Sequence, residues 1–132
     1  MSDLIRIPYT LPTMADFRAA VARRERELAE MQKDPAVRAA VDAARAEATK
    51  MARLLKEEFG ARRVRLFGSL ARGDATKESD IDLAVEGIDP GSFFRASARA
   101  ALLTQRRVDI IDVADASPLL RLRIDQDGVD LP

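Results

Sequence analysis

The chain has 132 residues, of which 47% are hydrophobic, and its 22 basic and 22 acidic residues give a formal net charge of zero at pH 7. This length predicts one domain with a compact core. The absence of cysteine and histidine excludes disulfides, thiolate zinc sites and imidazole catalysis. A neutral chain also lacks the basic footprint of a duplex-DNA-binding protein. No stretch has the length of a membrane span or the pattern of a signal peptide, so we expect a cytoplasmic protein without membrane contact.

The N-terminal residues predict an arm followed by a helix. Pro8 and Pro12 disfavour a helix within residues 1–12. This arm either packs on the domain or contacts a partner. Thr13 has the character of an N-cap, and Asp16 three residues later forms an imperfect capping box. Apolar residues then recur at intervals of three and four, which predicts a helix as far as about Gln32.

A second helix is expected from Pro35 to Phe59. Asp34 can cap it, proline suits its first turn, and Gly60 supplies its C-terminal stop. The two helices form a predicted hairpin. Its apolar residues either fold onto each other and support a sheet, or leave one stripe free for self-association or for a partner protein.

The remaining residues predict a small mixed sheet with helices. Expected strands are 64–67, 79–85 and 108–113; expected helices are 92–105 and 119–125; residues 70–79 form a polar loop, and 129–132 is a candidate edge segment. This order of elements indicates an α/β or α+β domain.

Two carboxylates stand inside the second of these strands. Asp80 and Asp82 are two residues apart, so their side chains share one face, while the apolar residues that alternate with them face a core. Paired carboxylates repel each other unless a cation compensates, and hard oxygen ligands suit Mg²⁺. Gly68 and Ser69 lie at the end of the preceding strand, where a glycine allows backbone N–H groups to approach an anion and a hydroxyl adds a donor. The strand–turn–strand unit therefore has the layout of metal-assisted phosphoryl or nucleotidyl transfer.

These residues resemble a known signature. The motifs are Gly68-Ser69-x-Ala71-Arg72-Gly73 and Ser79-Asp80-x-Asp82. They resemble those of the polymerase-β-like nucleotidyltransferase superfamily, and the short chain resembles its smallest branch, the minimal nucleotidyltransferases. The resemblance implies a polymerase-β-like core over residues 63–132, as one compact unit preceded by the N-terminal arm and helical hairpin at 1–62.

The resemblance also implies a third carboxylate on a later strand. Asp109 matches this position, and Asp112 is its rival, although an interval of three residues directs Asp112 to the opposite side of a strand. Asp80, Asp82 and Asp109 are then the catalytic, metal-binding carboxylates, holding two Mg²⁺ ions. Gly68 and Ser69 bind the phosphates of ATP, and Arg72 either meets the triphosphate or braces the carboxylates.

The resemblance implies a partner as well. Minimal nucleotidyltransferases are commonly antitoxins of HEPN toxins, so the expected activity is transfer of AMP from ATP to a hydroxyl of the toxin, a tyrosine, which would silence it. The expected partners are ATP, a HEPN-type toxin, and a homo-oligomer or hetero-complex formed through the N-terminal helices.

Three alternatives stay open. The chain could neutralise its toxin by contact, with a vestigial nucleotide site. An aminoglycoside nucleotidyltransferase would need a second domain or a dimer to complete its acceptor site. Asp80 and Asp82 could instead form a salt-bridged strand edge with Arg65 or Arg72.

Overall fold

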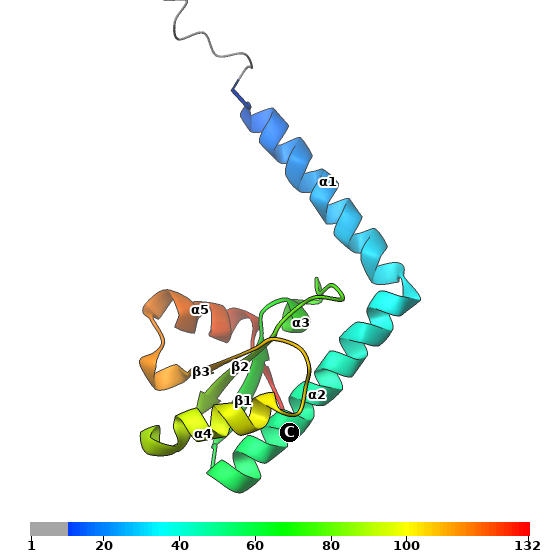
Figure 1. Ribbon diagram of the computed structural model, residues 1–132. Coiled ribbons are helices and arrows are strands. Elements are labelled where there is room, and N and C mark those ends of the chain that lie inside the picture. The colour runs from blue at the N-terminus through cyan, green and yellow to red at the C-terminus, as the bar shows by residue number, and fades with distance from the viewer. Residues whose placement is uncertain (1–10) are drawn as a thin grey trace, which may run out of the picture.

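The computed structural model describes residues 11–132, so the predicted arm at 1–12 lies almost entirely outside the described residues. The helices are α1 (Met14–Lys33), α2 (Pro35–Phe59), α3 (Ser69–Arg72), α4 (Pro90–Ala101), the 3₁₀ turn η2 (Val113–Asp115) and α5 (Pro118–Asp127); the strands are β1 (Arg63–Phe67), β2 (Ile81–Glu86), β3 (Val108–Asp112) and β4 (Val129–Asp130). Figure 1 shows the sheet and its helices as one body, from which α1 extends.

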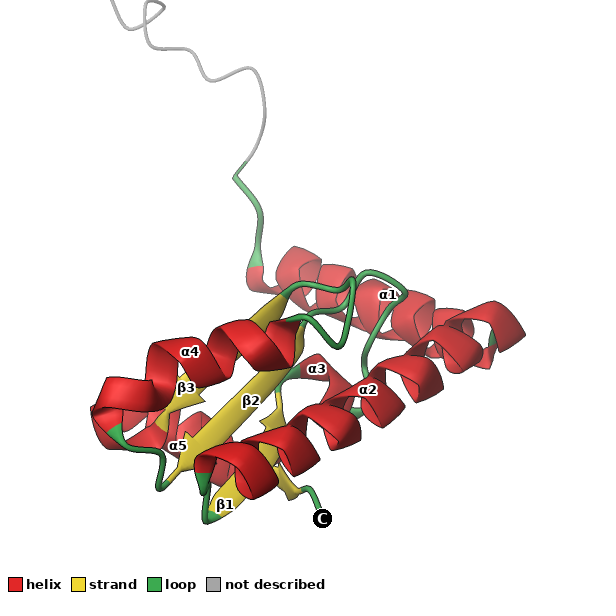
Figure 2. Cartoon of the chain, turned by 60° about the horizontal axis from the view of Figure 1, so that its bottom comes forward, coloured by secondary structure: helices red, strands yellow, loops and turns green. Residues whose placement is uncertain are grey.

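The four strands form one mixed sheet in the order β3-β2-β1-β4. β1 pairs antiparallel with both β2 and β4, and β2 pairs parallel with β3. The parallel pair needs a crossover, which α4 supplies (Figure 2). The predicted mixed sheet and the predicted edge segment at the C-terminus are both confirmed.

One face of the sheet packs on α2 and α4, and this contact holds most of the core. Alternate residues of β2, namely Ile81, Leu83 and Val85, are almost fully buried there, as the strand period predicted. Met51 and Leu55 of α2 are fully buried against the same face. The opposite face carries Phe67 and Ala84 and is covered by Ile124 and Leu120 of α5. The sheet therefore has two different faces, an apolar one under α2 and α4 and a partly polar one under α5.

Local signals set the ends of the helices. Thr13 and Asp16 form a complete capping box, because the Thr13 hydroxyl accepts from the Asp16 N–H and the Asp16 carboxylate accepts from the Thr13 N–H. Asp34 accepts from the Ala36 N–H and caps α2, and Gly60 ends α2 with φ of 73°. These predicted boundaries are confirmed.

The two N-terminal helices differ in their packing. α2 buries six residues, whereas α1 buries none. The helices meet only near Asp34 and Pro35, and Figure 1 shows α1 pointing away from the sheet. The expectation that the hairpin supports the sheet therefore holds for α2 only, and the apolar stripe of α1 stays uncovered in the described residues. An extended Asp34 followed by proline turns the chain at this point, and Arg24 interrupts the apolar stripe that α1 would need for a core contact.

Several boundaries differ from the sequence prediction. The segment expected as a loop at 70–79 begins with the short helix α3. β2 starts at Ile81, so Asp80 precedes the strand. α4 stops at Ala101, where the expectation extended to Gln105. Helix length and composition over residues 11–132 offer no candidate for crossing a bilayer.

Candidate active site

The six site residues predicted from the sequence line a single cavity of about 520 Å³. They are Gly68, Ser69, Arg72, Asp80, Asp82 and Asp109. The cavity lies at the edge of the sheet where β1 ends, on the face covered by α5. Five elements contribute to its lining, so the fold assembles residues that are up to 60 positions apart in the chain.

The three carboxylates come from two neighbouring parallel strands. Asp82 of β2 and Asp109 of β3 are register partners, so their Cα atoms lie about 4.8 Å apart and their side chains share a face. Asp80 stands two residues before Asp82 in the extended segment that leads into β2. The Ile81 N–H donates to the Arg107 carbonyl at 3.0 Å and anchors this segment beside β3.

Electrostatics show that the carboxylates are close enough to interact. The pKa of Asp82 is raised from 3.8 to about 6, first by burial and then by the negative charges of Asp109 and Asp80, while the positive charge of Arg72 opposes the shift. Asp82 is therefore held in an environment that disfavours its ionised form unless positive charge enters the cavity.

Gly68 makes room for this carboxylate. Its φ of 73° is unfavourable for other residues, and a Cβ at this position would overlap the Asp82 carboxylate, with the Asp82 Cγ only 3.2 Å away. Gly68 is also the residue that leads into α3, whose first turn carries Ser69. The glycine thus allows the Gly-Ser turn and the carboxylate cluster to be in direct contact.

The arginine of the motif is held by acidic neighbours. Arg72 contacts Asp74 and Asp127, each at 3.3 Å. Arg65 lies under α5 and pairs with Asp125 at 2.9 Å and with Glu86 at 3.6 Å. The structure gives neither arginine an ion pair with Asp80 or Asp82, which argues against a salt-bridged strand edge among the described residues.

Asp112 lies away from the cavity. Its carboxylate accepts from the Ala114 N–H at 3.0 Å and caps η2. It lines a separate hollow together with Arg62 and Arg121. Between the two candidate third carboxylates, only Asp109 lies with Asp80 and Asp82.

Sequence reasoning missed the contribution of α5. Leu120, Arg123 and Asp127 line the cavity from this helix, and Ile111 of β3 lies on the same lining. Arg123 forms no ion pair within residues 11–132, whereas Asp127 is paired with Arg72. The intervals of three and four residues on one helix could have indicated that these side chains share a face, but nothing in the sequence indicated which face meets the cavity.

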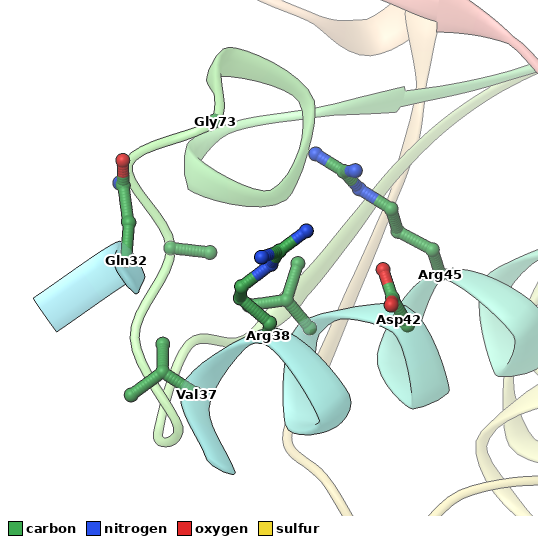
Figure 3. A pocket seen from close by; sticks show the side chains of 8 residues that line it. Gln32, Val37, Arg38, Asp42, Arg45 and Gly73 are labelled. Carbon is green, nitrogen blue, oxygen red and sulfur yellow. The ribbon is translucent and has the colours of Figure 1, made fainter. Parts of the chain in front are cut away.

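Arg45 of α2 forms hydrogen bonds with α3. Its Nε and Nη2 atoms both donate to the Leu70 carbonyl, at 3.1 and 2.7 Å. Arg45 also lines a second cavity of about 330 Å³ at the turn between α1 and α2, where Arg38 and Arg45 extend toward the loop that contains Gly73 (Figure 3). The short helix of the Gly-Ser motif is thus tied to the long helix that supports the sheet.

The donor set fits a hard divalent cation. Three carboxylates offer oxygen ligands, and the pKa of Asp82 is raised first by burial and then by neighbouring negative charge that a cation would compensate. Within residues 11–132, however, no three acidic side chains already converge closely enough to surround an ion. Binding would therefore require the carboxylates of the cluster to rotate toward a common point.

Comparison with known proteins agrees with this geometry. The family described as "Polymerase beta, Nucleotidyltransferase" matches residues 49–131. A solved structure provisionally named a minimal nucleotidyltransferase is 32% identical, with 69% of this chain and 95% of that chain covered and a TM-score of 0.58. A chain of a toxin–antitoxin complex solved with AMP-PNP is 27% identical, with 64% and 72% of the two chains covered and a TM-score of 0.56.

A curated relative from Methanocaldococcus jannaschii, provisionally named a protein adenylyltransferase, is 50% identical over 34 residues, or 26% of this chain. The aligned segment spans about a third of that relative's length (34%). The match of the family to most of the chain, together with the shared fold, establishes that the chain belongs to the polymerase beta nucleotidyltransferase family.

Proposed function

We propose that this protein transfers AMP from ATP to a hydroxyl group, that of a tyrosine on a HEPN-type toxin, and so acts as the antitoxin. The observation that carries the proposal is the single cavity in which the Gly68-Ser69 turn faces the carboxylates Asp80, Asp82 and Asp109. A phosphate-binding turn beside clustered carboxylates is the arrangement that metal-assisted nucleotidyl transfer requires.

The carboxylates supply the metal site. Asp80, Asp82 and Asp109 would hold Mg²⁺, which supplies charge neutralisation for the triphosphate and lowers the pKa of the attacking hydroxyl. The hydroxyl oxygen attacks the α-phosphorus, the bond from that phosphorus to the bridging oxygen breaks, pyrophosphate leaves, and the hydroxyl proton is released. The products are the AMP-modified hydroxyl and pyrophosphate.

The turn and Arg123 would bind the phosphates, whereas Arg72 has a different role. The Ser69 hydroxyl and the first amides of α3 are donors, since the first N–H groups of a helix have no partner inside it. Arg123 extends from α5 to the same cavity without an ion pair within the described residues, so it is available for a phosphate oxygen. Arg72 already contacts Asp74 and Asp127, which suits it to stabilise the loop and to oppose the charge of the carboxylates.

The nature of the acceptor is inferred from the relatives. A chain 27% identical to this one is part of a toxin–antitoxin complex that was solved with an ATP analogue. The M. jannaschii relative, which is similar over a short segment, has a name that specifies a protein as the acceptor. The first similarity supports ATP as donor, and the second supports a protein as acceptor.

The test uses the purified full chain, the protein encoded by the neighbouring gene as the candidate toxin, ATP labelled at the α-phosphate, and Mg²⁺. We expect label on the partner, and we expect Asp80→Ala/Asp82→Ala and Asp109→Asn to abolish it. Asp112→Asn is the matched control, because this carboxylate lies outside the cavity, and it should retain transfer. If no label appears while the wild type and the double variant both neutralise the toxin, the protein acts by contact and the proposed enzymatic function is wrong.

A further inference from the structure

α1 exposes apolar side chains that nothing else in the described chain covers. Met14, Phe17 and Val21 are 66%, 62% and 41% exposed, and no residue of α1 is buried. Figure 1 shows the N-terminal half of α1 well away from the sheet. An isolated helix of about 20 residues is only marginally stable in water, because helices in proteins gain most of their stability by packing an apolar stripe. Within residues 11–132, α1 therefore has no contact that covers its apolar stripe.

The stripe on α1 has the spacing of a coiled-coil seam. Residues at alternating intervals of three and four occupy the a and d positions of a heptad repeat: Met14, Phe17, Val21, Arg24, Leu28 and Met31. Arg24 is the one charged member. Its guanidinium forms an ion pair with Glu27 of the same helix at 3.5 Å, which leaves its methylene groups able to cover apolar surface at the seam.

We propose that α1 pairs in antiparallel orientation with α1 of a second copy of this chain. In the register with the longest overlap, Met14 faces Met31 of the second copy, Phe17 faces Leu28 of the second copy, and Val21 faces Arg24 of the second copy. Every large apolar residue of the stripe is then covered. The exposed N-terminal half of one helix packs on the C-terminal half of the other, where Leu28 and Met31 are only half-buried by their own chain.

The charges flanking the seam complement each other in this orientation. Arg18 and Glu25 both occupy e positions, and antiparallel pairing brings Arg18 of each copy beside Glu25 of the other, which forms two ion pairs related by the twofold axis. Parallel pairing would stack Arg24 on its own counterpart, and its flanking positions would bring together no residues of opposite charge. The pattern thus selects both the partner, a second copy, and the direction of pairing.

The size of the surface indicates a weak dimer. α1 is about 30 Å long, so two such helices make an interface at the small end of the range for specific complexes. Its five basic and four acidic residues nearly cancel, which gives a strongly charged partner no advantage. We expect a monomer–dimer equilibrium of the full-length chain in the micromolar range.

The first test is a charge-reversal cycle followed by sedimentation equilibrium. Arg18→Glu and Glu25→Arg should each weaken the dimer by about tenfold, because each replaces two attractive pairs with two repulsive ones. The double variant should restore wild-type affinity. Neither residue forms an ion pair within α1 or elsewhere in the described chain, so the changes act mainly on the interface. Arg26→Glu, on the outer face of the heptad, is the matched control and should have no effect.

The second test determines the orientation by disulfide formation. The natural chain has no cysteine, so introduced thiols can pair only with each other. A mixture of the Met14→Cys and Met31→Cys variants should form the mixed disulfide under mild oxidation, whereas Met14→Cys alone should not cross-link. Both positions are outside the core of the sheet, so the fold itself should be preserved, as thermal unfolding would verify.

Three results would overturn the proposal. A chain that remains monomeric at tens of micromolar has no such interface. Self-linking of the Met14→Cys variant would mean that the helices are parallel. A dimer that is insensitive to the charge reversals, or that the double variant fails to restore, uses another surface or another register.

Discussion

Asp82→Asn should stabilise the metal-free protein at neutral pH, although it removes a proposed catalytic group. The pKa of Asp82 is raised to about 6, first by burial and then by Asp109 and Asp80, so at neutral pH the folded protein contains an ionised carboxylate in an unfavourable environment. The carboxamide has nearly the same shape and no charge. The substitution therefore removes the cost of burying the charge and the repulsion from Asp109 and Asp80, without creating a cavity.

The size of the effect follows from the shift in pKa. A rise from 3.8 to about 6 corresponds to roughly 3 kcal/mol at 1.36 kcal/mol per pKa unit. Because the Asp82 side chain is only partly buried, solvent screening reduces this to about 1.5 kcal/mol. For a domain of this size, such a change raises Tm by about 5 °C.

The raised pKa of Asp82 also fixes how its contribution to folding stability changes with pH. The folded state binds the Asp82 proton more tightly than the unfolded state, so the contribution of Asp82 to stability is most favourable below the unfolded pKa of 3.8 and is lost as pH rises to about 6. The advantage of the asparagine variant should therefore be small near pH 4, grow up to about pH 6, and remain constant above about pH 7. Millimolar Mg²⁺ should raise Tm of the wild type and leave the variant almost unchanged.

Thermal unfolding followed by circular dichroism between about pH 4 and pH 8 measures this directly. Asp115→Asn, which replaces an exposed carboxylate outside the cavity, serves as the control and should not change Tm. A variant that is destabilised at about pH 8, or a gain in Tm that does not depend on pH, would refute the argument that Asp82 is held against charge repulsion.

The other predictions concern the geometry of the site. Gly68→Ala forces a Cβ onto the Asp82 carboxylate, so AMP transfer should fall by at least about a hundredfold in a radiolabel assay while the circular dichroism spectrum stays native. Arg45→Ala removes two hydrogen bonds to α3. The fold decrease in kcat should be about ten times the fold change in KM for ATP. Arg123→Ala should raise KM for ATP by about tenfold or more, whereas Arg121→Ala, on the other side of α5, should match the wild type in the same assay.

The helix ends and the buried faces of strands could be predicted from the sequence, because they depend on residues that are close together in the chain. Thr13, Asp34 and Gly60 predicted helix ends through hydrogen bonds and backbone conformations within a few residues. The alternation in β2 predicted that Asp82 faces away from the core, since the strand period needs no knowledge of the fold. Six of the residues that line the cavity were identified from spaced motifs and from the family that these motifs resemble.

The tertiary structure decided how distant segments meet. α5 covers the polar face of the sheet and contributes Arg123 and Asp127 to the cavity, and Arg45 of α2 reaches α3 across 25 residues of chain. The pairing of β2 with β3 brings Asp109 beside Asp82 and leaves Asp112 outside. These contacts depend on sheet order and on which helix face is buried, and periodicity within one segment carries no information about either.

The two N-terminal helices show the same division. Their sequences determined that both are helical and that each has an apolar stripe, because capping and spacing are local properties. Only the fold showed that α2 fills the core with its stripe while α1 leaves its own exposed. Burial is a property of the whole chain, since a stripe is covered only where the rest of the molecule provides a matching surface.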